Sequence, residues 1–135
     1  MKEFKLQIVT PDGLLYDGEA EKIILRTTEG DVGILANHAD YISPLSIGLC
    51  KVYIKSEIKV AALSGGMVSV TNGFVRVIAT TFEWSENIDI QRANKAKEKA
   101  ELKLKENKDN KYNYNLAEIK LKKSLARIKA SQYNK

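Results

Sequence analysis

The residues that could act as nucleophiles, general bases or soft metal ligands are few in this chain. There is one histidine, His38, and one cysteine, Cys50, among 135 residues. Nucleophilic catalysis needs an activating base within hydrogen-bond reach of the nucleophile, and a structural zinc site needs four ligands, mostly Cys and His. The Gly-x-Ser-x-Gly pattern of a nucleophile elbow does not occur either. We therefore expect no catalytic residue, no metal-binding residue and no enzymatic activity of the chain itself.

Two glycine-containing stretches match phosphate-binding loops only in part. They are residues 30–33 (Gly-Asp-Val-Gly) and residues 64–66 (Ser-Gly-Gly). Neither has the Lys-Ser or Lys-Thr pair that completes a phosphate loop. Glycine also allows backbone angles that other residues avoid. We therefore interpret the first stretch as a β-corner that leads to a polar loop at residues 37–40, and the second as a break in a strand.

Positive charge gathers in the last third of the chain. Residues 1–86 carry 8 Lys and Arg against 11 Asp and Glu, a net charge of −3, whereas residues 87–135 carry 14 against 6, a net charge of +8. The basic residues of the second helix expected there, from about Tyr114 to Gln132, are Lys120, Lys122, Lys123, Arg127 and Lys129. A cationic helix of this kind is attracted to acidic protein surfaces. The alternative is a lysine-rich face that is only solvated.

Residues 1–86 have the pattern of an all-β domain. Apolar and polar residues alternate over residues 3–9 and 49–55, as in half-buried strands. Turn formers separate the apolar runs, and the pair Asn72-Gly73 is a strong signal for a two-residue hairpin. We count about eight to ten short strands, which predicts a sandwich or a barrel.

Residues 87–135 have the pattern of a helical hairpin. Gly and Pro are absent there, Asn87 or Asp89 is suited to cap a first helix, and a second helix is expected from about Tyr114 to Gln132. Small and apolar residues recur at spacings of three and four, namely Ala93, Ala96, Ala100, Leu104, and then Ala117, Leu121, Ser124, Leu125 and Ile128. Stripes this narrow bury little area. We therefore expect an antiparallel hairpin that docks weakly and can detach.

Neither a membrane span nor a secretion signal is expected. No apolar run approaches the roughly 20 residues that cross a bilayer. Residues 1–6 alternate between polar and apolar, whereas a secretory signal has a continuous apolar core. We expect a protein of the cytoplasm or of a surface that faces it.

Three motifs occur in a fixed order along the chain. They are Glu29-Gly30-Asp31-Val32-Gly33-Ile34-Leu35 with His38 and Pro44-Leu45 after it, Leu63-Ser64-Gly65-Gly66 with Asn72 after it, and Asn87-Ile88-Asp89-Ile90-Gln91-Arg92-Ala93 at the start of the helical part. Together, in this order and spacing, they closely resemble the ε subunit family of bacterial F-type ATP synthase, called δ in mitochondria. The resemblance covers essentially the whole chain. Ala36-Asn37 departs from it, because the family often has Pro-Gly there, and so does Met67 after the double glycine.

The resemblance implies an α+β fold, with an N-terminal β-sandwich of about ten strands (residues 1–86) and a C-terminal antiparallel α-helical hairpin (residues 87–135). It implies a non-catalytic rotor subunit that helps to couple ion flow to ATP synthesis. Such a subunit lies at the cytoplasmic side of the cell membrane, peripherally, and reaches the membrane only through the complex. Its sandwich would bind the γ subunit and the ring of c subunits, and Asp31 and His38 would face that ring. The alternative for His38 is an ordinary solvated histidine of a loop.

The resemblance also implies that the hairpin inhibits ATP hydrolysis. In an extended state it would lie along γ and meet an acidic segment of the catalytic β subunits. The residues that would make this contact are Lys120, Lys122, Lys123 and Arg127. Their positive charge, noted above, agrees with an acidic partner.

Some bacterial members of the family bind ATP between the folded hairpin and the sandwich. The residues that match this site are Ile88, Asp89, Arg92 and Ala93, with Glu83, Lys123 and Arg127 expected nearby. Basic groups there could neutralise phosphates. ATP would be a regulatory ligand, and no cofactor is required. The alternative for Asp89 is that it only caps the helix.

The residues alone leave another function open, a basic helical nucleic-acid-binding module on a β domain. Basic helices can neutralise nucleic-acid phosphates, and Tyr112, Tyr114 and Tyr133 could stack on bases. The acidic charge of residues 1–86 and the position of these tyrosines, at the loop and the tail, argue against it. We therefore expect no nucleic-acid partner.

Overall fold

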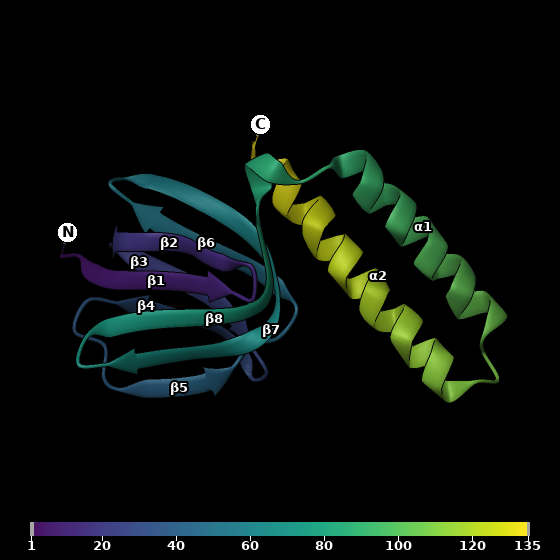
Figure 1. Cartoon of the computed structure of the whole chain (residues 1–135), viewed down its shortest axis with the longest axis horizontal. Coiled ribbons are helices and arrows are strands. Elements are labelled where there is room, and N and C mark those ends of the chain that lie inside the picture. Colours follow the sequence, from purple (N-terminus) through teal and green to yellow (C-terminus); the bar gives the residue numbers. More distant parts are fainter. Residues whose placement is uncertain (1, 135) are drawn as a thin grey trace.

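The computed structural model describes residues 2–134 and has two parts that follow each other in the sequence. Figure 1 shows two layers of strands, coloured purple to teal, beside a pair of helices in green and yellow. The strands are β1 (Phe4–Thr10), β2 (Gly13–Ala20), β3 (Lys22–Thr27), β4 (Gly30–Leu35), β5 (Tyr41–Pro44), β6 (Gly48–Ile54), β7 (Glu57–Thr71) and β8 (Phe74–Trp84). The helices are α1 (Ile90–Glu106) and α2 (Lys111–Ser131), with short 3-10 turns η1 (Ser85–Asn87) and η2 (Gln132–Asn134). The α+β fold predicted from the sequence is confirmed.

The two layers share β7 and β8, which are long enough to cross from one layer to the other. The hydrogen-bonded order is β2-β1-β8-β7-β6-β3-β4, and β5 also pairs with β7. Residues 57–63 of β7 pair with β6, whereas residues 67–70 pair with β5. β1 lies parallel to the first half of β8. The β7–β8 hairpin therefore connects the layers, and the core lies between them.

The bend that lets β7 change layers lies at Gly65 and Gly66. We expected residues 64–66 to break a strand, but β7 continues through them and keeps one register with β8 on both sides. The φ angles are 69° at Gly65 and 113° at Gly66. A Cβ at position 66 would overlap the carbonyl oxygen of Ile78. One bent strand therefore replaces two short ones, and the described residues form eight strands, within the eight to ten that the residue pattern predicted.

The core of the sandwich is made of alternate residues from the strands of both layers. Its fully buried large side chains are Leu6, Ile8, Ile23, Leu25, Ile34, Cys50, Val52, Leu63, Val68, Val70, Val75 and Val77. Cys50 is a free thiol in this core, and burial raises its pKa above the usual range. Cys50 thus packs as a small apolar side chain within this core.

Local turn signals were good predictors of the strand connections. Asn72 and Gly73 have φ angles of 51° and 80°, as a two-residue hairpin with positive φ at both positions requires. The polar loop at residues 37–40 joins β4 to β5. The β-corner expected at residues 30–33 is in fact the first part of β4, which follows a tight turn at residues 28–29.

The two helices form the predicted antiparallel hairpin. Asp89 caps α1, and Asn110 caps α2 through a hydrogen bond to the N–H of Asn113. α2 therefore starts at Lys111, earlier than the expected Tyr114. The small residues Ala93, Ala100, Ala117 and Ser124 are buried in the contact between the helices. α2 packs on β6 and β7, while α1 packs on the other side of α2, away from the strands (Figure 1).

Candidate functional site at the junction of sandwich and hairpin

The hairpin touches the sandwich through a small apolar cluster. Ala130 of α2 is buried against Val60 and Ala62 of β7. Leu49, Ile88 and Ala126 surround these three residues and are partly buried. Because the cluster consists mostly of alanine and valine, it removes little apolar area from water. The hairpin is therefore fastened to the sandwich by few contacts, as its narrow stripes predicted.

One ion pair and one aromatic contact add to this cluster. Arg127 Nε of α2 lies 3.4 Å from Glu83 Oε1 at the end of β8, and both side chains are more than a third exposed. Lys51 Nζ lies 5.0 Å from the ring centre of Tyr133. Exposed ion pairs contribute about 0–1 kcal/mol. These contacts orient α2 without fixing it firmly.

Two neighbouring cavities share this ion pair. The first, of about 370 Å³, lies beside the start of α1, and its walls include Glu83, Asp89, Arg92, Ala93 and Arg127. Five of the seven residues predicted to form an ATP site therefore line one cavity. Ile88 belongs to the apolar cluster instead.

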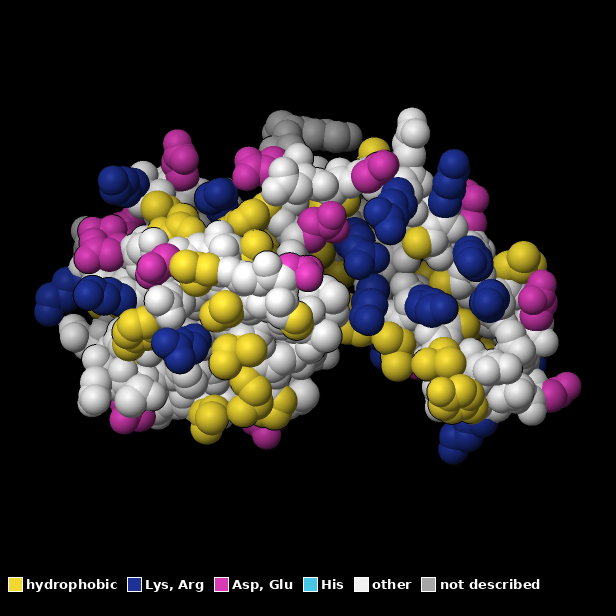
Figure 2. Space-filling view, in the orientation of Figure 1, with side chains coloured by type: hydrophobic (Ala, Val, Ile, Leu, Met, Phe, Trp, Pro, Cys, Tyr) yellow, Lys and Arg dark blue, Asp and Glu magenta, His cyan; other side chains and the backbone are white. Residues whose placement is uncertain are grey.

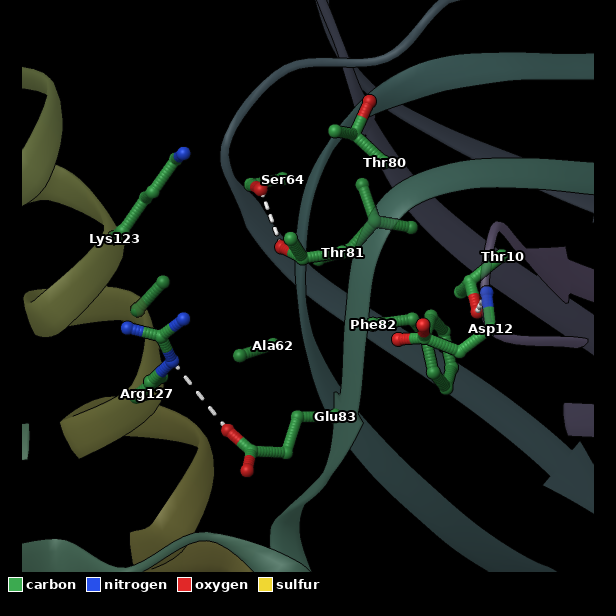
Figure 3. A pocket seen from close by; sticks show the side chains of 12 residues that line it. Thr10, Asp12, Ala62, Ser64, Thr80, Thr81, Phe82, Glu83, Lys123 and Arg127 are labelled. Carbon is green, nitrogen blue, oxygen red and sulfur yellow. Dashed lines mark hydrogen bonds and ion pairs between the residues drawn. The ribbon is translucent and has the colours of Figure 1, made fainter.

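The second cavity, of about 200 Å³, lies between α2 and the bend of β7 and β8. Figure 3 shows Lys123 and Arg127 on the helix side, with Ser64, Thr81 and Glu83 on the strand side. Ser64 and Thr81 are joined by a hydrogen bond between their hydroxyl groups. Lys123 thus lies in the cavity next to the one that the other predicted residues line.

Asp89 has a structural role that the sequence also allowed. Its Oδ1 accepts a hydrogen bond of 3.1 Å from the backbone N–H of Arg92, so it is the N-cap of α1. An ionised carboxylate has two oxygens and about four acceptor positions. The cap occupies one of them, so a ligand in the cavity could still be recognised by the same side chain.

Several residues that line these cavities were not predicted from the sequence. Asn87 and Ala96 line the first, and Thr10, Asp12 and Thr80 line the second. Ala96 follows Arg92 by four residues, so the helical period could have indicated it. Thr10 and Asp12 come from the β1–β2 turn, and only the folded arrangement of the strands places them there.

The four basic residues predicted to contact an acidic partner do not form one face. Lys120, Lys123 and Arg127 line a groove between the helices. Lys122 points elsewhere, and its Nζ lies 3.8 Å from Glu118 Oε1. In Figure 2, Lys and Arg side chains gather over the hairpin, whereas the visible face of the sandwich mixes both charges with apolar patches. The structure thus concentrates the positive charge on the hairpin.

The structure places Asp31 and His38 at opposite ends of β4. Asp31 lies at its start, where Oδ1 is 3.4 Å from Arg26 Nη1 of β3. His38 lies in the loop after the strand; its Nδ1 is 2.7 Å from the carbonyl oxygen of Ala39, and its ring meets that of Tyr41 edge-on at 5.7 Å. A strand of six residues is about 20 Å long. These two residues are therefore separate points on the surface and not one cluster.

The described residues contain neither a cluster of metal ligands nor a helix suited to cross a membrane. Among residues 2–134, no three His, Cys, Asp or Glu side chains come together in a way that could hold a metal ion. No helix in this part of the chain combines the length and the apolar character that crossing a membrane demands.

The protein thus belongs to the class in which a β-sandwich domain carries a weakly docked helical hairpin. Both the sandwich and the hairpin match domains of known proteins. Residues 3–85 match the family "ATP synthase, Delta/Epsilon chain, beta-sandwich domain", and residues 86–132 match "ATP synthase, Delta/Epsilon chain, long alpha-helix domain". The chain belongs to the delta/epsilon chain family of ATP synthase.

Individual relatives agree with this family along the whole chain. The chain is 40% identical over 134 residues to the ATP synthase epsilon chain of Caldanaerobacter subterraneus subsp. tengcongensis, covering 98% of this chain and 96% of that one. It is 48% identical over 101 residues to the epsilon chain of Alkaliphilus oremlandii, covering 75% of each. Its structure superposes with a TM-score of 0.83 and 25% identity on a chain of the Euglena gracilis mitochondrial ATP synthase, covering 96% of this chain and 81% of that one.

Proposed function

We propose that this protein is a non-catalytic subunit of the central stalk of an F-type ATP synthase, where it helps to couple ion flow to ATP synthesis. The observation that supports this most directly is the match of both parts of the chain to the delta/epsilon family. In this role the sandwich binds the γ subunit and the c-ring, with Asp31 and His38 at two separate contact points. The protein is held at the cytoplasmic side of the cell membrane by these partners.

Copurification from native membranes tests this assignment. A tagged full-length chain is expected to bring down γ, β and c subunits, and a tagged chain of residues 1–86 is expected to bring down the same subunits. Cysteine variants of Asp31 and His38 should form crosslinks to c, while Asp17→Cys, on another strand of the sandwich, serves as the control. Isolation of the full-length chain without any of these subunits would refute the assignment.

We further propose that the hairpin inhibits ATP hydrolysis when it leaves the sandwich. The support comes from the small apolar cluster and the exposed Glu83–Arg127 pair, since a helix held this weakly detaches at modest cost. Detachment would free Lys123 and Arg127, which together with Lys120 and Lys122 would meet an acidic segment of the β subunits. Replacing all four with Gln should raise hydrolysis by the assembled enzyme. Replacing Lys97, Lys99, Lys105 and Lys108 of the α1 region instead should raise it less.

We also propose that ATP binds in the cavity beside the start of α1 and favours the docked hairpin. Support comes from the five predicted residues that line this cavity: the sandwich contributes the carboxylate of Glu83, and the hairpin contributes the carboxylate of Asp89 and the guanidinium groups of Arg92 and Arg127. A ligand that contacts both parts stabilises the docked state by its difference in affinity for the two states. Calorimetry should show ATP binding to the full-length chain, a loss of roughly tenfold or more for Arg92→Ala, and little change for Lys97→Ala. Equal affinities for the three proteins would refute this site.

A further inference from the structure

The segment that leads from β8 to α1 lies between the two parts of the protein (Figure 1). The backbone pairing of β8 with β7 ends at Trp84, opposite Ala61. Residues 85–87 follow as η1, which lies beyond this pairing and contacts both β7 and the last turn of the chain, η2. Side-chain contacts must therefore decide whether this segment moves with the sandwich or with the hairpin.

Lys59 of β7 makes two contacts with this segment. Its Nζ lies 4.4 Å from the ring centre of Trp84 and 3.7 Å from Glu86 Oε1. Phe82 meets the Trp84 ring edge-on at 4.8 Å, and both rings pack against the core of the sandwich. In the part of the chain that the structure describes, no other ion pair involves residues 85–87. Lys59 thus joins the end of β8 and η1 to β7.

The side chain of Lys59 lies on the face of β7 that is turned away from the hairpin. Successive side chains of a strand point to opposite faces. Val60 and Ala62 pack with Ala130 of α2, whereas Ala61 belongs to the core of the sandwich. Lys59 shares the face of Ala61. Its contacts with Trp84 and Glu86 therefore do not need α2 and can persist when the hairpin leaves.

The next two residues are held differently. Ile88 packs in the apolar cluster with Ala130 and Ala126 of α2, so it loses neighbours when the hairpin detaches. Ile88 and Asp89 are both extended, with φ and ψ of −80° and 124° and of −81° and 102°, and α1 begins at the following residue. Two extended residues span at most about 7 Å. The start of α1 would therefore stay close to the sandwich while the helices swing.

We propose that Lys59 is a positioning residue, which keeps residues 84–87 on the sandwich in both states and so sets the pivot of the hairpin at Ile88 and Asp89. The pivot rests on the detachment proposed above, whereas the contacts of Lys59 do not. A short tether keeps the hairpin at a high effective concentration near its partners. Release of residues 84–87 would lengthen the tether and lower that concentration.

Trp84 is the only tryptophan of the chain, so its fluorescence reports on this contact directly. In the full-length protein, Lys59→Gln should raise the acrylamide quenching constant of Trp84 about twofold or more, because the ring loses the cation that covers it. Lys59→Arg should restore the natural value, since a guanidinium group stacks on an aromatic ring and also pairs with a carboxylate. Lys55→Gln removes the same charge from the turn before β7 and should match the natural chain. Equal quenching of the Gln variants at positions 59 and 55 would overturn the inference.

A second arm tests the pivot. Ala130→Gln, which should detach the hairpin, is expected to change the quenching of Trp84 less than about 1.5-fold, because residues 84–87 stay on the sandwich. If Ala130→Gln alone exposes Trp84 as much as Lys59→Gln does, the pivot lies before residue 84 and the inference is wrong.

Spin labels at Asp17→Cys and Glu101→Cys follow the distance between the sandwich and α1, while Cys50 is buried and stays unlabelled. Ala130→Gln should broaden the distribution of this distance, and adding Lys59→Gln should broaden it about twofold further, since the tether is longer. Adding Lys55→Gln should not. An equal width for these two additions would contradict the pivot. An Ala130→Gln chain with the distances of the natural chain would refute detachment, and quenching would still test the contacts of Lys59.

Discussion

At the scale of single residues, Gly66 carries the conformational constraint that makes the sandwich possible. Its φ of 113° and its approach to the backbone of Ile78 and Ala79 leave no room for a Cβ. The sequence indicated that glycines mattered here, but it did not indicate why. The reason is that one strand must bend sharply to serve two layers while its neighbour stays paired with it.

Gly66→Ala is therefore expected to destabilise the sandwich by about 2–4 kcal/mol, because a positive φ and a backbone overlap are imposed together. Urea denaturation monitored through Trp84 fluorescence measures the loss. Gly33→Ala is the control, since a Cβ there meets only the end of the Lys22 side chain at 3.7 Å. Equal stability of the two variants would contradict the account of the bend.

The buried thiol of Cys50 should make the stability of the protein depend on pH. Burial raises the pKa of its thiol in the folded protein, whereas an unfolded thiol has a pKa of about 8.5. Above the unfolded pKa, the folded state binds one more proton than the unfolded state, so stability falls as pH rises. Above about pH 8.5, the free energy of unfolding should therefore decrease by up to about 1.4 kcal/mol per pH unit because of Cys50. Below that pH the effect of Cys50 should be weak. Denaturation curves between about pH 7 and 9.5 measure it, and Cys50→Ala should remove it. A slope unchanged in that variant would assign the effect to other groups.

At the scale of elements, the start of α1 serves as both a helix end and a wall of a cavity. Asp89 caps the helix through the N–H of Arg92 and lines the cavity with it. The sequence predicted both roles, and the structure demonstrates the first. The second role, contact with a ligand in the cavity, can be separated from capping by a substitution that keeps the cap.

Asp89→Asn is expected to keep the cap, because asparagine caps helices about as well as aspartate. Asp89→Ala should lose about 1 kcal/mol of helix stability with the cap. Circular dichroism and thermal unfolding distinguish the two variants. If the carboxylate also contacts ATP, both variants should bind ATP more weakly; if Asp89 only caps the helix, Asp89→Asn should bind ATP like the natural chain.

The predictions that succeeded were those set by local chemistry. Asn72-Gly73 fixes a hairpin through its own backbone angles, and the spacing of Ala93 and Ala100 fixes one face of a helix. The failures were non-local. Residues 60–63 are all apolar and show no alternation, so the sequence did not show that Val60 and Ala62 face α2 while Ala61 and Leu63 face the core. Likewise, nothing in the sequence indicated that Thr10 and Asp12 share a cavity with Lys123.

The contact between α2 and the sandwich can be weakened without disturbing either part. Ala130 is completely buried against β7, so Ala130→Gln should push the hairpin off while the sandwich stays folded. Hydrogen exchange should become at least several-fold faster in α1 and α2 and should stay unchanged in the strands. Leu125→Gln is the control on the same helix, because Leu125 is 44% exposed. Similar exchange in the two variants would mean that the apolar cluster does not hold the hairpin in place.

At the scale of the whole molecule, stability and charge are distributed in opposite ways. The sandwich has the large core and a net charge of −3 over residues 1–86. Residues 87–135 contact the sandwich through a small apolar cluster and have a net charge of +8. A rigid part suits permanent attachment to partners. A loosely held, cationic part suits movement between the sandwich and an acidic surface.

ATP hydrolysis by the assembled enzyme is the most direct test of this division of roles. Enzyme reconstituted with residues 1–86 should retain γ and c, and should hydrolyse ATP severalfold faster than enzyme with the full-length chain when free nucleotide is low. Enzyme that carries Ala130→Gln in the full-length chain should hydrolyse ATP more slowly than enzyme with the natural chain, because the detached hairpin inhibits more strongly. Equal hydrolysis rates for the truncated and full-length proteins, with both fully incorporated, would contradict the claim that a detachable hairpin controls the enzyme.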